Sequence, residues 1–151
     1  MNETQTDTEA CSLFIERTFP VTSDKVFKAW TKSEALCNWF APSDEMKTEI
    51  LELDVRVGGR YCLKMINAED EEFIVAGEYV AIEPNQQLIF TWQWQSHEGS
   101  VEMLITLNFI ENNGVTDFSL LQERIPNKES RDEHNKGWTG CLARLETCLE
   151  N

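Results

Sequence analysis

Basic residues are scarce in this 151-residue sequence, which has 13 Lys and Arg against 27 Asp and Glu and a formal net charge of −14. A surface this acidic repels the phosphates of nucleic acids and the head groups of anionic membranes. Apolar runs are also short, far below the roughly 20 residues that a membrane span requires. We therefore expect neither nucleic acid nor a membrane as a partner. The charge itself has two interpretations, a solvated surface that favours solubility or a docking site for a basic partner.

Motifs for metal binding and catalysis are missing as well. The five cysteines show no C-x-x-C spacing, and we expect reduced thiols in a cytoplasmic protein; they are Cys11, Cys37, Cys62, Cys141 and Cys148. The two histidines, His97 and His134, are far apart and belong to no H-x-x-x-H or H-E-x-x-H motif. No G-x-S-x-G nucleophile elbow occurs. We expect no metal and no cofactor, and the sequence singles out no catalytic residue.

The composition predicts one folded domain. Hydrophobic residues make up 41% of the chain and aromatic residues 10%, which is too much for a disordered acidic segment. About 150 residues is a common size for a single core. The first residues are polar and lack the basic and apolar regions of a signal peptide. We expect a flexible tail over residues 1–11 and a single domain over residues 12–151.

The hydrophobic pattern predicts an α+β fold. A strand over residues 12–19 is followed by two short helices, of which the second starts at a capping box formed by Thr31 and Glu34. Apolar and polar residues then alternate in about six segments separated by short polar turns, as expected for an antiparallel meander. After Pro126 the period returns to that of a helix, from about Glu129 to Leu149. We predict a sheet of about seven strands wrapped around this long C-terminal helix.

Two glycines, Gly137 and Gly140, lie inside this long helix. Each costs about 1 kcal/mol relative to Ala in a helix interior, so some compensation is expected. Either the helix approaches the sheet closely there, or room is left for something between helix and sheet. His134, four residues before Trp138, could form a hydrogen bond at the mouth of such a space or pack at the end of the helix.

Six motifs occur in the order and spacing of one family. They are Phe27-x-Ala29-Trp30-Thr31, Trp39-Phe40-Ala41-Pro42, Asp54-x-Arg56-x-Gly58-Gly59-Arg60, Gly77-x-Tyr79-x-x-Ile82-x-Pro84, Leu88-x-Phe90-Thr91-Trp92 and Gly137-Trp138. Over residues 12–149 the chain resembles the C-terminal-domain family of the heat-shock-protein-90 ATPase activator, in the START-like (Bet v 1-like, SRPBCC) superfamily. The resemblance implies a helix-grip fold with a cavity between sheet and helix. Across the superfamily such cavities hold lipids, polyketides, hormones or drugs.

Inward-facing aromatic, aliphatic and methionine side chains are the candidate binding residues. They are Trp39, Phe40, Leu63, Met65, Tyr79, Phe90, Trp92, Trp94, Met103, Ile105, His134, Trp138 and Leu142. They can form either an ordinary dry core or an apolar pocket with a few polar groups, namely the Tyr79 hydroxyl, the indole N–H groups and His134.

These residues favour non-catalytic binding of a small apolar or aromatic molecule. One alternative, which rests on the resemblance and on the acidic surface, is a chaperone-associated or stress-response accessory domain that binds another protein. A second is a cyclase or hydrolase that uses the cavity, which would need a general acid or base. A cavity of roughly 300 Å³ or more favours ligand binding, whereas a filled core favours the accessory domain.

Overall fold

The computed structural model describes residues 12–95 and 99–150, so the predicted tail over residues 1–11, Cys11 and His97 lie outside the described residues. The elements are β1 (Leu13–Phe19), α2 (Ser23–Thr31), α3 (Ser33–Trp39), β2 (Lys47–Leu53), β3 (Arg60–Ile66), β4 (Glu72–Glu83), β5 (Gln87–Trp94), β6 (Met103–Asn112), β7 (Val115–Glu123) and α4 (Lys128–Glu150). Within these ranges, no helix is long and apolar enough to cross a membrane.

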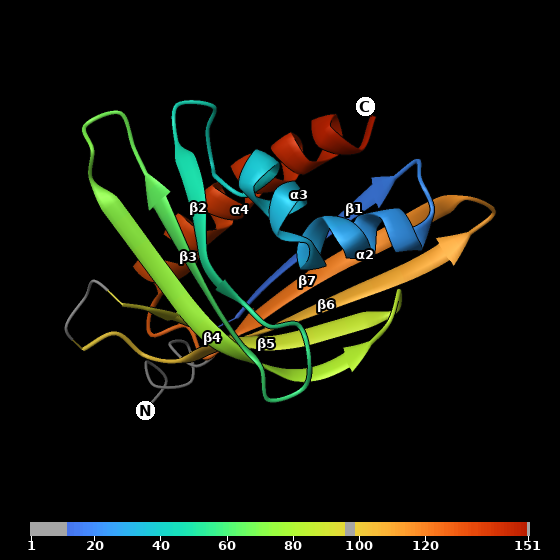
Figure 1. Ribbon diagram of the computed structural model, residues 1–151. Helices are drawn as coiled ribbons and strands as arrows, with labels where there is room; N and C mark the ends of the chain where they lie inside the picture. Colours follow the sequence, from blue (N-terminus) through green and yellow to red (C-terminus); the bar gives the residue numbers. More distant parts are fainter. Residues whose placement is uncertain (1–11, 96–98, 151) are drawn as a thin grey trace.

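The seven strands form one antiparallel sheet in the order β1-β7-β6-β5-β4-β3-β2. From β2 to β7 each strand pairs with the next one along the chain. The first strand joins at the far edge, where Leu13 lies opposite Gln122 and Phe19 opposite Thr116. Figure 1 shows that the sheet is strongly curved and that the helices lie on its concave side. The predicted α+β helix-grip fold is confirmed.

Alternation of side chains along the strands explains which face is buried. In β5, Leu88, Phe90 and Trp92 are buried while the residues between them are half-buried. The inward residues of β6 continue this apolar face, from Met103 to Phe109. The register shifts between Tyr79 and Ala81 in β4, and a bulge of this kind bends a strand and increases its twist.

The two short helices fill one end of the concave face. Trp30 of α2 stacks on Phe118 of β7, with ring centroids 5.7 Å apart and planes 17° apart. The second helix begins at Ser33, so the predicted capping box of Thr31 and Glu34 is wrong. Thr31 is the last residue of α2, and its hydroxyl donates to the Phe27 carbonyl at 3.0 Å. Its backbone is therefore helical, whereas an N-cap residue requires an extended one.

The long helix α4 covers the rest of the concave face. Its buried residues are Trp138, Cys141, Leu142 and Leu145, and the helix packs on α2, α3 and β1. Arg144, in the second half of α4, joins the helix to the end of α3, because its Nε donates to the Trp39 carbonyl at 3.2 Å. The first half of α4 faces a cavity instead.

Candidate functional site

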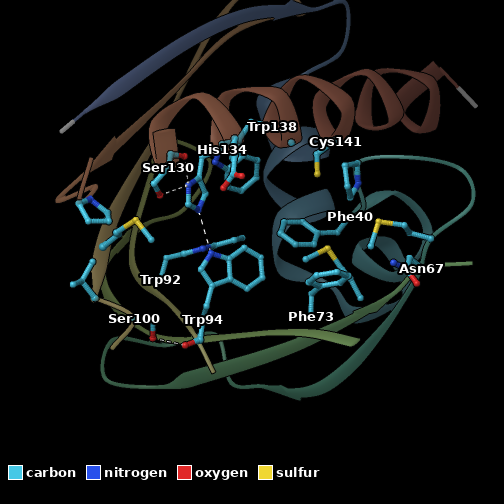
Figure 2. Close-up of a pocket in the computed structure, with 18 residues that line it drawn as sticks. Phe40, Asn67, Phe73, Trp92, Trp94, Ser100, Ser130, His134, Trp138 and Cys141 are labelled. Atoms are coloured by element: carbon cyan, nitrogen blue, oxygen red, sulfur yellow. Dashed lines mark hydrogen bonds between the residues drawn. The ribbon is translucent and has the colours of Figure 1, made fainter. Parts of the chain in front are cut away.

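A cavity of about 620 Å³ lies between the first half of α4 and strands β3 to β6. This volume is within the range of sites for small molecules, roughly 300–1,000 Å³. Figure 2 shows the cavity, with α4 along one side and with Trp94, Ser100, Phe73 and Asn67 on the opposite side. The prediction that room remains between helix and sheet is therefore met at this end of α4.

Seven of the thirteen candidate residues line the cavity. They are Phe40, Met65, Trp92, Trp94, Met103, His134 and Trp138. The other six, Trp39, Leu63, Tyr79, Phe90, Ile105 and Leu142, are buried elsewhere in the core. Leu63, Tyr79 and Phe90 surround a separate void of about 20 Å³, which is large enough for about one water molecule. The Tyr79 hydroxyl is thus not part of the cavity wall.

Eleven further residues line the cavity that the sequence did not single out as binding residues. They are Pro42, Met46, Asn67, Phe73, Ser100, Val101, Pro126, Ser130, Glu133, Gly137 and Cys141. Helical spacing was a usable signal for Ser130, Gly137 and Cys141, because they lie three, four or seven residues from His134 and share its face of α4. The residues from connecting loops carry no such signal.

His134 forms a hydrogen bond across the cavity. Its Nε2 accepts from the indole Nε1–H of Trp94 at 3.2 Å, and its Nδ1 lies 2.9 Å from the Ser130 carbonyl. An acceptor at Nε2 and a donor at Nδ1 define the neutral imidazole, protonated at Nδ1. Burial lowers the pKa of His134, opposed by the Ser130 carbonyl and by the nearby Glu133 carboxylate. Figure 2 shows this contact, which joins α4 to β5.

The indole N–H of Trp138 forms a hydrogen bond to the sheet. Its indole Nε1–H donates to Oε1 of Gln122 on β7 at 2.8 Å, and Gln122 Nε2 lies 3.2 Å from the Met103 sulfur. Gln122 is fully buried. The alternation through Thr116, Phe118 and Leu120 extends to this glutamine, so the sequence contained a signal for it.

Trp92 forms the centre of the aromatic wall. Its ring centroid lies 5.2 Å from that of Trp138, 5.5 Å from that of Trp94 and 6.0 Å from that of Phe40. Only 4% of the Trp92 side chain is exposed. Its indole N–H has no hydrogen-bond partner within residues 12–95 and 99–150.

Charge is almost missing from the cavity wall. Among the described residues that line it, Glu133 is the carboxylate, and there is no lysine or arginine. Burial raises the pKa of the Cys141 thiol to about 12, so this cysteine is protonated and unreactive near neutral pH. No group of three or more His, Cys, Asp or Glu side chains within residues 12–95 and 99–150 could hold a metal ion. The arrangement can desolvate and orient an apolar molecule.

The chain was compared with known protein families, curated proteins and solved structures. The family described as "Activator of Hsp90 ATPase homolog 1-like protein" matches residues 20–150. Among curated proteins, none matches the chain in sequence. Family membership supports a ligand-binding or accessory domain in general terms, without a specific ligand or partner.

Several solved structures are similar to the chain. A protein from Chromobacterium violaceum has a TM-score of 0.86 at 23% identity and covers 93% of this chain and 97% of its own. The AHSA1 protein from Silicibacter pomeroyi has a TM-score of 0.81 at 25% identity, with 92% and 97% covered. A protein from Arthrobacter aurescens has a TM-score of 0.82 at 17% identity, with 95% and 88% covered. The fold is thus shared along almost the whole chain.

Proposed function

The chain belongs to the family of activator of Hsp90 ATPase homolog 1-like proteins, and we propose that it binds a small, mostly apolar molecule in the cavity under α4. The observation that carries this proposal is the cavity of about 620 Å³ with three tryptophans in its wall. The seven candidate residues that line the cavity would contact the ligand.

Desolvation would supply most of the affinity. Each Å² of apolar ligand surface removed from water contributes about 25 cal/mol, so ~200 Å² contributes about 5 kcal/mol before the costs of association. Methionine side chains fill irregular spaces and indole rings stack on flat molecules. Met46, Met65 and Met103 and the three tryptophans therefore suit a flat or flexible apolar ligand.

A variant that fills the cavity tests the proposal. A Cβ atom added at Gly137 would meet no atom within 4 Å, so Gly137→Leu should place its side chain in free space without disturbing the helix. Ala143→Leu is the matched control, because Ala143 is exposed on the same helix. Tryptophan fluorescence and calorimetric titrations with flavonoids, fatty acids and polyketides would measure binding.

We expect at least one compound class to bind the wild type and Ala143→Leu equally, and Gly137→Leu at least tenfold more weakly. An unchanged signal with every compound would contradict the proposal. So would equal affinity of the two leucine variants.

A second candidate function is an accessory role on a chaperone. The family description favours it, and a formal net charge of −14 suits a basic docking surface on a partner. Purified Hsp90 should then be retained by the immobilised chain at low salt and released as salt rises. Absence of retention at low salt would count against this role.

We also propose a reducing, cytoplasmic location. The four cysteines of the described residues are free thiols, as expected for such a compartment. Titration of thiols after purification without reductant should detect free thiols in place of disulfides.

A further inference from the structure

The polar side chains at one end of the cavity form hydrogen bonds with one another and with the backbone. The Trp94 N–H donates to Nε2 of His134 at 3.2 Å, and Nδ1 of His134 lies 2.9 Å from the Ser130 carbonyl and 3.4 Å from its hydroxyl. The Ser100 hydroxyl donates to the Trp94 carbonyl at 2.6 Å. Figure 2 shows these contacts within the cavity wall. The donor of Trp94 and the acceptor of His134 are therefore already occupied by the protein.

Asn67, which follows β3 and also lines the cavity, is occupied as well. Its Oδ1 accepts from the backbone N–H groups of Glu69 and Glu71 at 3.0 and 2.9 Å. Its Nδ2 donates to the Glu71 carboxylate at 2.8 Å. Both functions of this amide serve the turn between β3 and β4, so they are not available to a ligand.

The other two indole N–H groups of the wall are also closed to a ligand. The Trp138 N–H donates to Gln122 on β7 at 2.8 Å. The Trp92 N–H has no partner among the described residues, but its nitrogen is buried and is not exposed to the cavity. The wall therefore presents a ligand mainly with aromatic rings, aliphatic groups and methionine side chains.

A wall of this kind penalises polar ligand atoms. An enclosed carbonyl or hydroxyl would lose its hydrogen bonds to water and gain none from the side chains around it, which is unfavourable. The exposed lining residues are Val101, Pro126 and Glu133, and they mark where the cavity meets solvent. A polar group of the ligand could remain hydrated at that edge.

We propose that the part of the ligand enclosed in this cavity is a hydrocarbon, aromatic or aliphatic, and that the hydrogen bond between Trp94 and His134 determines this specificity. This inference rests on the proposed function and adds the chemical class of the ligand. Trp94 and His134 both line the cavity, and each occupies the hydrogen-bonding atom of the other. Without one partner, the atom of the other would become available to a ligand.

Two probes of matched shape measure the specificity. We would titrate 2-isopropenylnaphthalene and its ketone isostere 2-acetylnaphthalene against the wild type. The alkene should bind about 5- to 150-fold more tightly than the ketone, the range expected when one carbonyl is buried without a hydrogen bond.

Two variants assign the specificity to the pair. His134→Ala removes the acceptor and leaves the Trp94 N–H free to donate to the ketone, so the alkene-to-ketone affinity ratio should fall about two- to tenfold, as expected for one neutral hydrogen bond. Met65→Ala is the matched control, because it enlarges the same cavity without freeing a polar group. It should weaken both probes alike and keep the ratio.

The indole ¹H–¹⁵N signal of Trp94 gives an independent measurement. In the wild type the two probes should shift this signal equally, because His134 retains the hydrogen bond. In His134→Ala the ketone should add a downfield proton shift that the alkene does not produce. The wild-type ratio and shifts decide the question if His134→Ala does not fold.

The outcomes distinguish the two proposals. Equal or tighter binding of the ketone by the wild type, unequal wild-type shifts, or a ratio that changes alike in His134→Ala and Met65→Ala would overturn the hydrocarbon inference and leave the proposed function intact. Failure of both probes to bind, while a flavonoid or polyketide binds, would have the same meaning. If no compound of either set binds, the proposed function is overturned and the inference with it.

Discussion

Two glycines three residues apart on α4 have opposite surroundings. A Cβ atom at Gly140 would lie 2.2 Å from the carbonyl oxygen of Pro42, whereas one at Gly137 would meet nothing within 4 Å. Of the two explanations that the sequence allowed, free space is realised at Gly137, whereas the close approach at Gly140 differs from the predicted one. The close approach is to the backbone after α3 and not to the sheet.

Alanine at these two positions should consequently have opposite effects. Gly140→Ala should lower the free energy of unfolding by about 1–3 kcal/mol, because the helix must move away from Pro42. Gly137→Ala should raise it by up to about 1 kcal/mol, since alanine has the higher helix propensity and meets no obstacle. Urea unfolding monitored by circular dichroism measures the free energy of unfolding of both variants. Changes of the same sign would contradict the assignment of a close contact to Gly140 and of free space to Gly137.

His134 should make stability depend on pH. Its pKa is lowered in the folded protein from the ordinary value of 6.5, so the unfolded chain binds more protons between the two values. The stabilisation is fully present above pH 6.5 and is lost as the pH falls towards the lowered pKa. Protonation at Nε2 also removes the acceptor for Trp94, and the groups that face this imidazole are Trp94, Ser130 and Glu133.

Denaturant midpoints measured from pH 8 down to about pH 5.5 test this dependence. The loss of stability should be present in the wild type and in His97→Gln, and it should shrink in His134→Gln, which does not titrate. Identical pH profiles for the wild type and His134→Gln would falsify the assignment to His134.

At the scale of elements, the buried pair of Trp138 and Gln122 joins α4 to β7. Replacing Gln122 by leucine keeps most of the volume but leaves the Trp138 N–H without an acceptor. We expect Gln122→Leu to lower the free energy of unfolding by about 1–3 kcal/mol. Gln86→Leu, at an exposed turn position, should change it by less than about 0.5 kcal/mol. Similar losses in both variants would show that the pair contributes little.

The sequence predicted the elements well because their periodicity is strong and their turns are short. It also predicted which face of β3, β4, β5 and β6 is buried, but not which part of that face borders open space. Phe73 and Tyr79 show the difference, since both are on β4 and six residues apart, yet Phe73 lines the cavity and Tyr79 lies in the filled part. Whether an inward side chain of β4 lines the cavity or lies in the filled core depends on where α2 and α3 pack on the curved sheet.

The sequence also could not predict which loop residues line the cavity. Pro42, Val101 and Pro126 reach the cavity because the curvature of the sheet brings three distant connections to its rim. Alternation and helical spacing carry no information about this curvature. By contrast, Trp92 and Trp138 could be predicted as cavity candidates because they follow the repeat of a strand and of a helix.

For the whole molecule, the net charge of −14 predicts a salt effect. Carboxylates outnumber basic groups about twofold, and exposed pairs such as Lys28–Asp24 at 3.7 Å contribute little. Repulsion among the surface carboxylates destabilises the compact state, and salt screens it over a Debye length that falls from about 30 Å at 0.01 M to about 8 Å at 0.15 M. The urea midpoint at pH 7 should therefore rise over this range of sodium chloride. A midpoint that stays constant or falls would contradict this prediction.

The absence of lysine and arginine from the described cavity wall has a kinetic consequence. An anionic amphiphile would be repelled by the acidic surface during its approach and would find no cation at the end of its path. Neutral molecules feel neither effect, so they would enter at rates that are nearly independent of ionic strength. The acidic surface would then discriminate against anionic ligands by lowering their rate of encounter with the protein, before any contact forms.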